Sequence, residues 1–372
     1  MRSSALLTFS IVLLTGLIVC MAATVRAEEG DAGGTTDRQS LDVSYLPSDV
    51  FAVWITHPQR IAKTPMMAPL AKLDRDATYG TLALWGIEFK SGGRRIETVQ
   101  QIFAISTPKH DVDGFPRPRT FIYRFAEPVD GKRMMEETRE TSFEEADYRG
   151  QRYYRDERKA ASYIIRPAFF QPDGRTIVCT YEPHLRKILF EAAKPKPVSG
   201  PLLDRLRQVD ARGDMIGAVL LEPTWEFIDF YVEDAKRGLP GGAAAWARIP
   251  EQLDAAVVTI SLTGSATVEM ELDAKSRESA EKVLDLVNGG RDGLRDFFKA
   301  NRQQMIENVR LPLDEPGIDL IDQMLAGLSA KLQGNQIVVS VRRPAGLEAF
   351  IAGTAESIMS EQRNRRAREP HN

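Results

Sequence analysis

The 372-residue sequence has few of the residues that usually mark a specific chemistry. It contains two cysteines and four histidines, too few for a disulfide-stapled small fold or a four-cysteine zinc site. Its 49 Lys and Arg do not outnumber its 52 Asp and Glu, and the net charge is -3. The basic excess that drives nucleic-acid binding through phosphate neutralisation is therefore missing, and we expect no nucleic acid among the partners.

Motifs with a known mechanism are also missing. The sequence has no Gly-x-Ser-x-Gly nucleophile elbow, no Gly-x-x-x-x-Gly-Lys phosphate loop, no His-Glu-x-x-His zinc helix and no Cys-x-x-Cys pair. Its glycine pairs do not follow a strand in the way that a dinucleotide site requires. We therefore expect no cofactor and identify no catalytic residue. The composition, 43% hydrophobic and 27% charged, is that of an ordinary globular protein.

The one long apolar run lies at the N-terminus. Arg2 precedes an apolar segment over residues 5–23, and Val25-Arg26-Ala27 then places small residues three and one before a break. This pattern predicts a signal peptide over residues 1–27 and an exported protein, periplasmic or extracellular. The alternative is an uncleaved membrane anchor, because the run approaches the ~20 residues that a span needs. Only in that case do we expect the protein to contact a membrane.

Cleavage would change the charge and the cysteine count of the mature chain. It removes two arginines, which leaves 47 minus 52, or -5, and it leaves Cys179 as the single cysteine. The strand-like segment 176–181 around this cysteine predicts a small buried hydrophobic residue. Residues 28–40 have no apolar side chain larger than Ala and predict a disordered tether, and residues 361–372 form a polar, basic tail.

The sequence carries one pattern twice, in a divergent form that needs gaps to align. Residues 49–58 and 214–223 each contain an Asp, an apolar run and a Pro at the same spacing, and a Pro that ends a strand suits the first turn of a helix. Each half closes with a strand that ends at Pro183 or Pro344. Alternating apolar residues predict antiparallel hairpins in both halves, formed by residues 99–106 with 120–126, and by 257–262 with 268–272.

The order of elements in each half is strand, helix, hairpin, helix, strand, helix. This order predicts an α+β protein with two divergent repeats, each a ferredoxin-like (split βαβ) antiparallel sheet with helices on one face. We place the first repeat at residues 41–197 and the second at 198–360, with the Pro-rich segment 194–201 as the joint. A single continuous sheet made by both halves is the alternative.

Three short segments resemble a known group of proteins. Tyr45-Leu46-Pro47-Ser48-Asp49, the strand end His57-Pro58 and Leu84-Trp85-Gly86-Ile87 are similar to segments of uncharacterised exported proteins of planctomycete-type bacteria with a duplicated α+β module. The resemblance covers most of the mature chain, but its motifs are short and structural. It implies export and a duplicated fold, and it implies no activity.

One loop carries the best candidate for a metal site. His110, Asp111 and Asp113 lie in the long connection of the first predicted hairpin, which the second repeat lacks. An imidazole with two carboxylates can bind a divalent cation, although Asp-x-Asp-Gly lacks the remaining ligands of an EF-hand. Turn-forming hydrogen bonds of the Asp side chains explain the same residues without a metal.

An aromatic-rich helix is the candidate for a partner contact. Residues 225–232 are apolar over most of the helix circumference, so this helix must be covered on more than one side. Burial within the fold is one explanation, and contact with an envelope protein or a second copy of the chain is the other. The side chains concerned are Trp225, Phe227, Phe230 and Tyr231.

These features predict an exported, non-catalytic envelope protein that binds a partner or has a structural role. The alternative is an exported hydrolase whose acid and base are carboxylates from separate segments. A catalytic protein would show convergent ionisable groups with perturbed pKa values in a concave site.

Overall fold

The structure is a computed structural model of the chain. The structure describes residues 40–69, 98–107, 119–139, 141–158, 166–225, 248–262, 267–307 and 315–368. The predicted signal peptide and residues 28–39 of the tether lie outside these ranges. The described residues form helices and antiparallel pairs of strands, with turns between them. This confirms the α+β class.

The chain divides into two compact units. The first comprises the described residues of 39–215 together with 351–368, and the second comprises those of 216–350. The expected repeat boundary near residue 198 stays a prediction, since compactness does not test a duplication.

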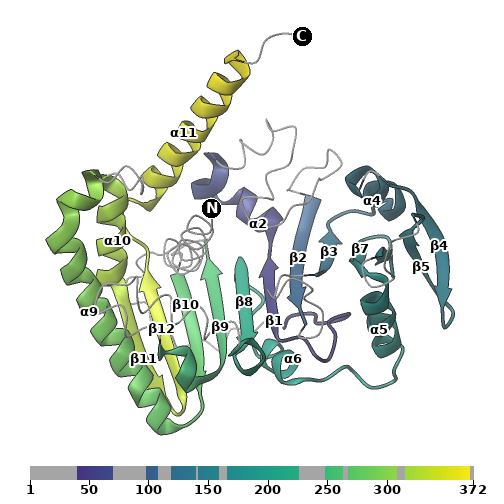
Figure 1. Ribbon diagram of the computed structural model, residues 1–372, viewed down its shortest axis with the longest axis horizontal. Coiled ribbons are helices and arrows are strands. Elements are labelled where there is room, and N and C mark those ends of the chain that lie inside the picture. The colour runs from purple at the N-terminus through teal and green to yellow at the C-terminus, as the bar shows by residue number, and fades with distance from the viewer. Residues whose placement is uncertain are drawn as a thin grey trace. The chain divides into compact units, whose positions relative to one another are not determined.

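Seven strands form the sheet of the first unit (Figure 1). Their order is β1-β2-β3-β7-β6-β5-β4, and the pairs are antiparallel. The strands are β1 (Ala52–Thr56), β2 (Val99–Ser106), β3 (Thr120–Phe125), β4 (Phe143–Tyr148), β5 (Gln151–Asp156), β6 (Pro167–Phe170) and β7 (Thr176–Tyr181).

Prolines separate strands from helices in this unit, as the sequence predicts. Strand β1 ends at Thr56, and Pro58 is the first residue of the next helix. Strand β7 ends at Tyr181, and Pro183 is the second residue of the helix that follows. Proline fits there because the first helical N–H groups have no partner within the helix. The helices are α2 (Pro58–Lys63), η1 (Pro65–Met67), α4 (Gly131–Arg139), α5 (Glu182–Ala192) and α6 (Pro201–Leu206).

Aromatic and sulfur-containing side chains build the core of the first unit. Met134 and Met135 of α4 pack against sheet residues from β2, β3, β6 and β7. Phe143 stands edge-on to Phe169, with ring centroids 5.1 Å apart. Cys179 belongs to this cluster and is 5% exposed, so the prediction of a small buried side chain is confirmed.

Five strands form the sheet of the second unit in the order β11-β12-β10-β9-β8. The predicted hairpin is confirmed, since β9 and β10 pair antiparallel with Val268 opposite Ile260. The strands are β8 (Met215–Leu220), β9 (Leu253–Ser261), β10 (Thr267–Ala274), β11 (Leu328–Gln333) and β12 (Gln336–Arg342).

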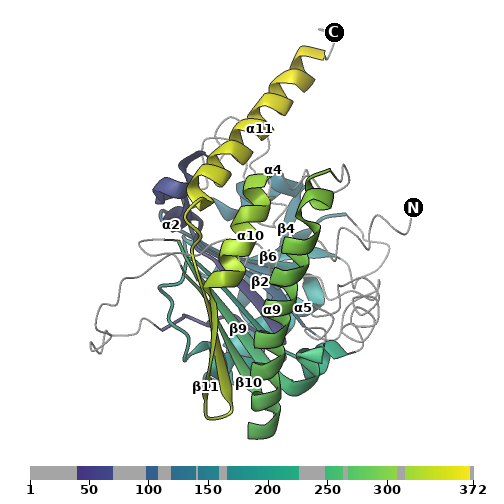
Figure 2. The same ribbon diagram turned by 90° about the vertical axis from the view of Figure 1, so that its left-hand side faces the viewer.

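Two long helices, α9 (Arg277–Glu307) and α10 (Glu315–Gly327), cover one face of these strands (Figures 1 and 2). Leu294 of α9 packs against Ile321 and Leu325 of α10. Ser276 caps α9, because its hydroxyl accepts a hydrogen bond from the Ser279 N–H at 3.1 Å. The remaining elements of this unit are η5 (Glu222–Thr224) and η7 (Pro250–Gln252). Helix α11 (Leu347–Arg368) begins here, but its residues from 351 on belong to the first unit, and it runs through most of the predicted basic tail.

The strand order differs from the ferredoxin-like expectation. In a split βαβ unit, the two strands joined by the helical crossover are parallel and another strand lies between them, so they are not neighbours. Here β1 pairs directly with β2 in antiparallel orientation, and β2 pairs with β3. The order of elements along the chain does not specify which strands become neighbours, because strand pairing depends on long-range contacts.

None of the helices that the structure describes is both long and apolar enough to cross a membrane.

Candidate functional site

Most of the predicted site residues lie outside the described parts of the chain. These are His110, Asp111 and Asp113 of the metal prediction, and Phe227, Phe230 and Tyr231 of the partner prediction. Trp225 is described and half-buried, and the Lys275 ammonium lies 4.8 Å from the centre of its ring. Within the described ranges, no group of three or more His, Cys, Asp or Glu side chains is arranged to hold a metal ion.

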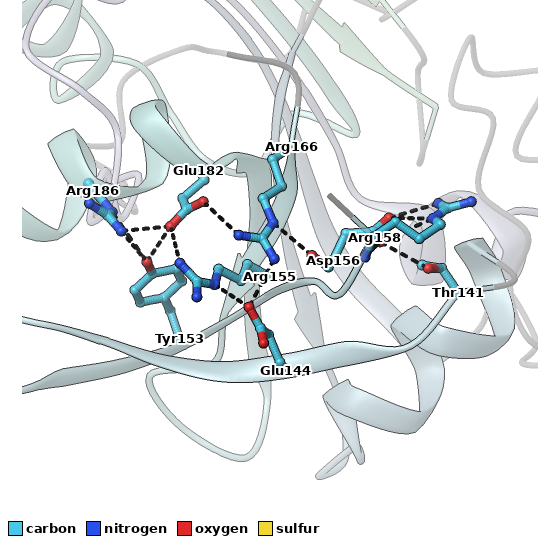
Figure 3. A network of polar contacts seen from close by, with 9 residues as sticks. All are labelled: Thr141, Glu144, Tyr153, Arg155, Asp156, Arg158, Arg166, Glu182 and Arg186. Atoms are coloured by element: carbon cyan, nitrogen blue, oxygen red, sulfur yellow. Dashed lines mark hydrogen bonds and ion pairs between the residues drawn. The ribbon is translucent and has the colours of Figure 1, made fainter. Parts of the chain in front are cut away.

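A network of polar side chains surrounds a buried carboxylate in the first unit (Figure 3). We call it the Glu182 network. Its nine members come from strands β4 and β5, helix α5 and the segments beside them: Thr141, Glu144, Tyr153, Arg155, Asp156, Arg158, Arg166, Glu182 and Arg186.

Local structure places each side chain of this network. Glu182 is the first residue of α5, where a carboxylate interacts favourably with the helix dipole. Arg186 lies one turn later on the same helix face. Tyr153 and Arg155 are two residues apart on β5 and therefore point to the same face of the sheet. Glu144 lies directly opposite Arg155 on β4, which makes them a cross-strand ion pair.

Glu182 receives three hydrogen bonds on one oxygen. Its Oε1 accepts from the Tyr153 hydroxyl at 2.6 Å, from Arg186 Nη2 at 2.7 Å and from Arg155 Nη1 at 3.4 Å. Its Oε2 lies 3.8 Å from Arg166 Nη1. The carboxylate itself is fully buried, at 0% exposure. Three donors replace water at Oε1, whereas Oε2 accepts no hydrogen bond from the described residues and is balanced by the ion pair with Arg166.

Glu182 stays ionised in spite of its burial. Burial by itself raises the pKa of this carboxyl, but the hydrogen bond from Tyr153 and the charges of Arg186 and Arg155 outweigh it, so the pKa lies below its ordinary value of 4.5. Burial and the same hydrogen bond raise the pKa of Tyr153. The pair is therefore a fixed acceptor and a fixed donor at neutral pH, and neither group exchanges a proton there.

The other end of the network is held in the same way. Asp156 is 2% exposed, and it accepts from Arg158 Nη2 at 2.7 Å and from the Thr141 hydroxyl at 3.1 Å. The hydrogen bond from Arg158 is the main reason that the pKa of Asp156 is lowered. Arg166 connects the two ends, because it donates to Glu144 and to the backbone oxygen of Asp156.

His57 is one of two buried histidines among the described residues. It lies at the start of α2 and is 8% exposed. Gln101 accepts a hydrogen bond from Arg124, so its amide nitrogen donates to His57 Nε2 at 3.0 Å and requires that nitrogen to be unprotonated. Burial and the charge of Arg60 lower the pKa of His57 to about 4.

Cys179 is also held in one protonation state. Burial raises the pKa of its thiol to about 11. Because the thiolate is the nucleophilic form, this cysteine is not activated at neutral pH.

No sequence signal indicates the Glu182 network as a unit. Glu182 precedes Pro183 at a strand end, which predicts a helix start and nothing about burial. The alternating charges of β4 and β5 were the available signal, since Glu144 and Arg155 face each other in a tight hairpin. Arg166, which precedes β6, and the members from α5 join only through tertiary packing.

Comparison with known proteins adds a distant likeness of fold. No protein-family model matches the sequence, and a search of curated proteins found no match. Crystal structures of TP0453, a Treponema protein, are similar over 85% of this chain. Form I is 8% identical, with a TM-score of 0.36 and 98% of its chain covered, and form IV is 7% identical, with a TM-score of 0.39 and 97% covered. At these values the likeness carries no statement about function.

Proposed function

We propose that this protein is an exported, non-catalytic protein of the cell envelope that binds a partner or has a structural role. The state of its buried ionisable groups supports this proposal. Glu182 is ionised and enclosed by arginines, His57 is neutral, and Cys179 is a protonated thiol. General acid-base chemistry needs a pKa near the working pH, and these shifts move each group away from it.

We further propose that the two units arose by duplication of one α+β module. The strand orders β1-β2-β3-β7-β6 and β8-β9-β10-β12-β11 support this. Strands that hold the same position in the two sheets also occur in the same order along the chain. In the first unit the tight β4–β5 hairpin precedes the closing strands, and in the second the tight β11–β12 hairpin forms them. Along the chain a helix follows the last strand in each case, α5 after β7 and α11 after β12. Strands β4 and β5 then have no counterpart in the second unit among the described residues.

Export is tested by expressing the full chain in a Gram-negative host and fractionating the cells. We expect the protein in the periplasmic or envelope fraction, with an N-terminus at Glu28 by mass spectrometry. Recovery from the cytosol with residues 1–27 attached would contradict export. Recovery from the membrane with those residues attached would support the uncleaved anchor instead.

The non-catalytic role is tested by two measurements on the purified protein. We expect no turnover of chromogenic esters, phosphates or glycosides above the buffer rate, and we expect immobilised protein to capture a partner from its own envelope fraction. Turnover that disappears in His110→Ala or Asp111→Asn would favour the hydrolase. A calorimetric titration with calcium and zinc tests the metal prediction for His110, Asp111 and Asp113, and a heat of binding lost in Asp113→Asn would support it.

A further inference from the structure

A small basic and aromatic surface lies at the junction of helix α5 and the β4–β5 hairpin in the first unit. Phe190 is 38% exposed and is the only large hydrophobic side chain of the described residues that is classed as exposed. Arg186, Phe190 and Lys194 are spaced four residues apart, which places them along one side of α5 and its end. We call Tyr148, Arg149, Arg186, Phe190 and Lys194 the Phe190 patch.

Cations surround the exposed ring. The Arg149 guanidinium lies 4.5 Å from the centre of the Phe190 ring, and the Lys194 ammonium lies 4.8 Å from it. Arg149 and Arg186 both lie over Tyr148, at 5.7 and 5.6 Å. Such contacts orient the charged groups at the surface without neutralising them.

The backbone of Arg149 is unfavourable for an arginine. Arg149 and Gly150 form the two-residue turn of the hairpin, with φ of 56° and 79°. Turns of this kind favour Asn-Gly, and the left-handed conformation is unfavourable for a residue such as arginine. In the β11–β12 hairpin of the second unit the first turn residue is Gly334, with φ of 64°. The first unit therefore has an arginine in a left-handed conformation where glycine or asparagine would form the turn without strain.

The two outer cations of the patch have no carboxylate partner in the part of the chain that the structure describes. Arg149 and Lys194 form ring contacts and no ion pair there. The acids nearest in sequence are engaged elsewhere: Asp147 accepts from the Gly150 N–H at 3.1 Å, and Glu191 accepts from the backbone and hydroxyl of Ser48, both at 2.8 Å.

We propose that the Phe190 patch is a docking surface for an acidic segment of a partner protein. This inference rests on the binding role proposed above. Arg149 and Lys194 would pair with carboxylates of the partner, and the planar guanidinium of Arg149 suits bidentate contact with one of them. The Phe190 ring would pack against the aliphatic stems of the same acidic side chains. One ring already covered by cations offers too little apolar surface for membrane insertion, which favours a protein over a lipid surface.

The probe is a fluorescein-labelled oligo-glutamate peptide, titrated with the full chain at low and at moderate salt and followed by fluorescence anisotropy. We expect saturable binding that weakens with salt, and a loss of affinity of about tenfold or more in the double variant Arg149→Asn, Lys194→Gln. The matched control is Arg152→Gln. It removes one positive charge from the same hairpin, where Arg152 is exposed and pairs with Glu145 outside the patch.

Stability separates docking from a merely structural role. Asparagine tolerates the backbone of residue 149, so Arg149→Asn is expected to keep or raise the melting temperature while it weakens binding. A lowered melting temperature with unchanged binding would show that the arginine serves the fold, and would overturn the proposal.

Three further results would overturn it. These are no binding of the peptide by the unchanged chain, an equal loss of affinity in Arg152→Gln, and binding to phosphatidylglycerol vesicles in place of the peptide. Failure here with continued capture of an envelope partner would leave the proposed function standing on a different surface. Failure of capture with retained peptide binding would count against the envelope role alone.

Discussion

Glutamine in place of Glu182 tests whether the buried network is held together by charge. Glu182→Gln keeps the size of the side chain and one acceptor oxygen, and it removes the charge. The carboxylate is fully buried and receives donors from Tyr153, Arg155 and Arg186. Removing one partner of a buried ion pair costs about 3–5 kcal/mol, because the charges left behind are not solvated.

The structure places the expected loss at the lower end of this range. Arg155 and Arg166 keep Glu144 as a second carboxylate partner, at 2.7 and 2.9 Å. We therefore expect Glu182→Gln to lower the free energy of unfolding of the first unit by about 3 kcal/mol. The matched control is Glu144→Gln, whose side chain is 41% exposed. An ion pair at the surface contributes little to stability, so the control should be much milder.

The pH dependence gives a second measurement of the same charge. The pKa of Glu182 is lowered in the folded protein. Its contribution to stability is therefore fully present above the unfolded pKa of 4.5 and is lost as the pH falls through the folded pKa. Urea unfolding followed by circular dichroism should show a large difference in the free energy of unfolding between the unchanged protein and Glu182→Gln at neutral pH. This difference should shrink as the pH falls into the acid range.

Two outcomes would refute this reasoning. One is a loss of stability no larger than that of Glu144→Gln, which would mean that the arginines are adequately solvated without the buried charge. The other is a difference in the free energy of unfolding between the unchanged protein and Glu182→Gln that stays constant through the acid range. That result would assign the effect to packing and not to ionisation.

Three further predictions concern single residues. At pH 8 the thiol of Cys179 should react with a thiol reagent only on unfolding, because burial raises its pKa to about 11; rapid labelling of the native chain would contradict its burial. Gly200→Ala should destabilise the first unit by about 1–3 kcal/mol in thermal unfolding, because a Cβ there meets the backbone oxygen of Ser48. An unchanged melting temperature would show that the backbone moves to accommodate the methyl group. His57 has a folded pKa of about 4 against 6.5 unfolded, so the unfolded state binds more protons between these values and stability falls by up to about 3 kcal/mol as the pH drops through them. His57→Gln should remove this part of the slope, and equal slopes would argue against the low pKa.

Local sequence signals predicted much of the secondary structure. Alternating apolar residues located β2, β3, β9 and β10, because a strand with one buried face needs period two. Prolines marked the strand ends before α2 and α5, because proline fits the first turn of a helix. A serine directly before a helix favours a cap, and the Ser276 hydroxyl accepts a backbone hydrogen bond at the start of α9.

These local signals did not predict which strands pair when they lie far apart in the chain. The ferredoxin-like order followed from the succession of elements along the chain, yet β1 pairs directly with β2. The Phe190 patch has a visible part, the spacing of Arg186, Phe190 and Lys194, but its other half comes from a hairpin turn about 40 residues earlier in the chain. Spacing along one helix does not show which distant turn will pack against it.

The sequence by itself determined the α+β class, the two main hairpins, the strand ends at prolines and the burial of Cys179. Each of these depends on a few neighbouring residues whose periodicity or backbone preference fixes the outcome. The tertiary structure decided the strand neighbours, the burial of Glu182 among three arginines and the exposure of Phe190 between two cations. Burial and charge pairing depend on the distance between residues far apart in sequence, and only the folded chain brings those residues together.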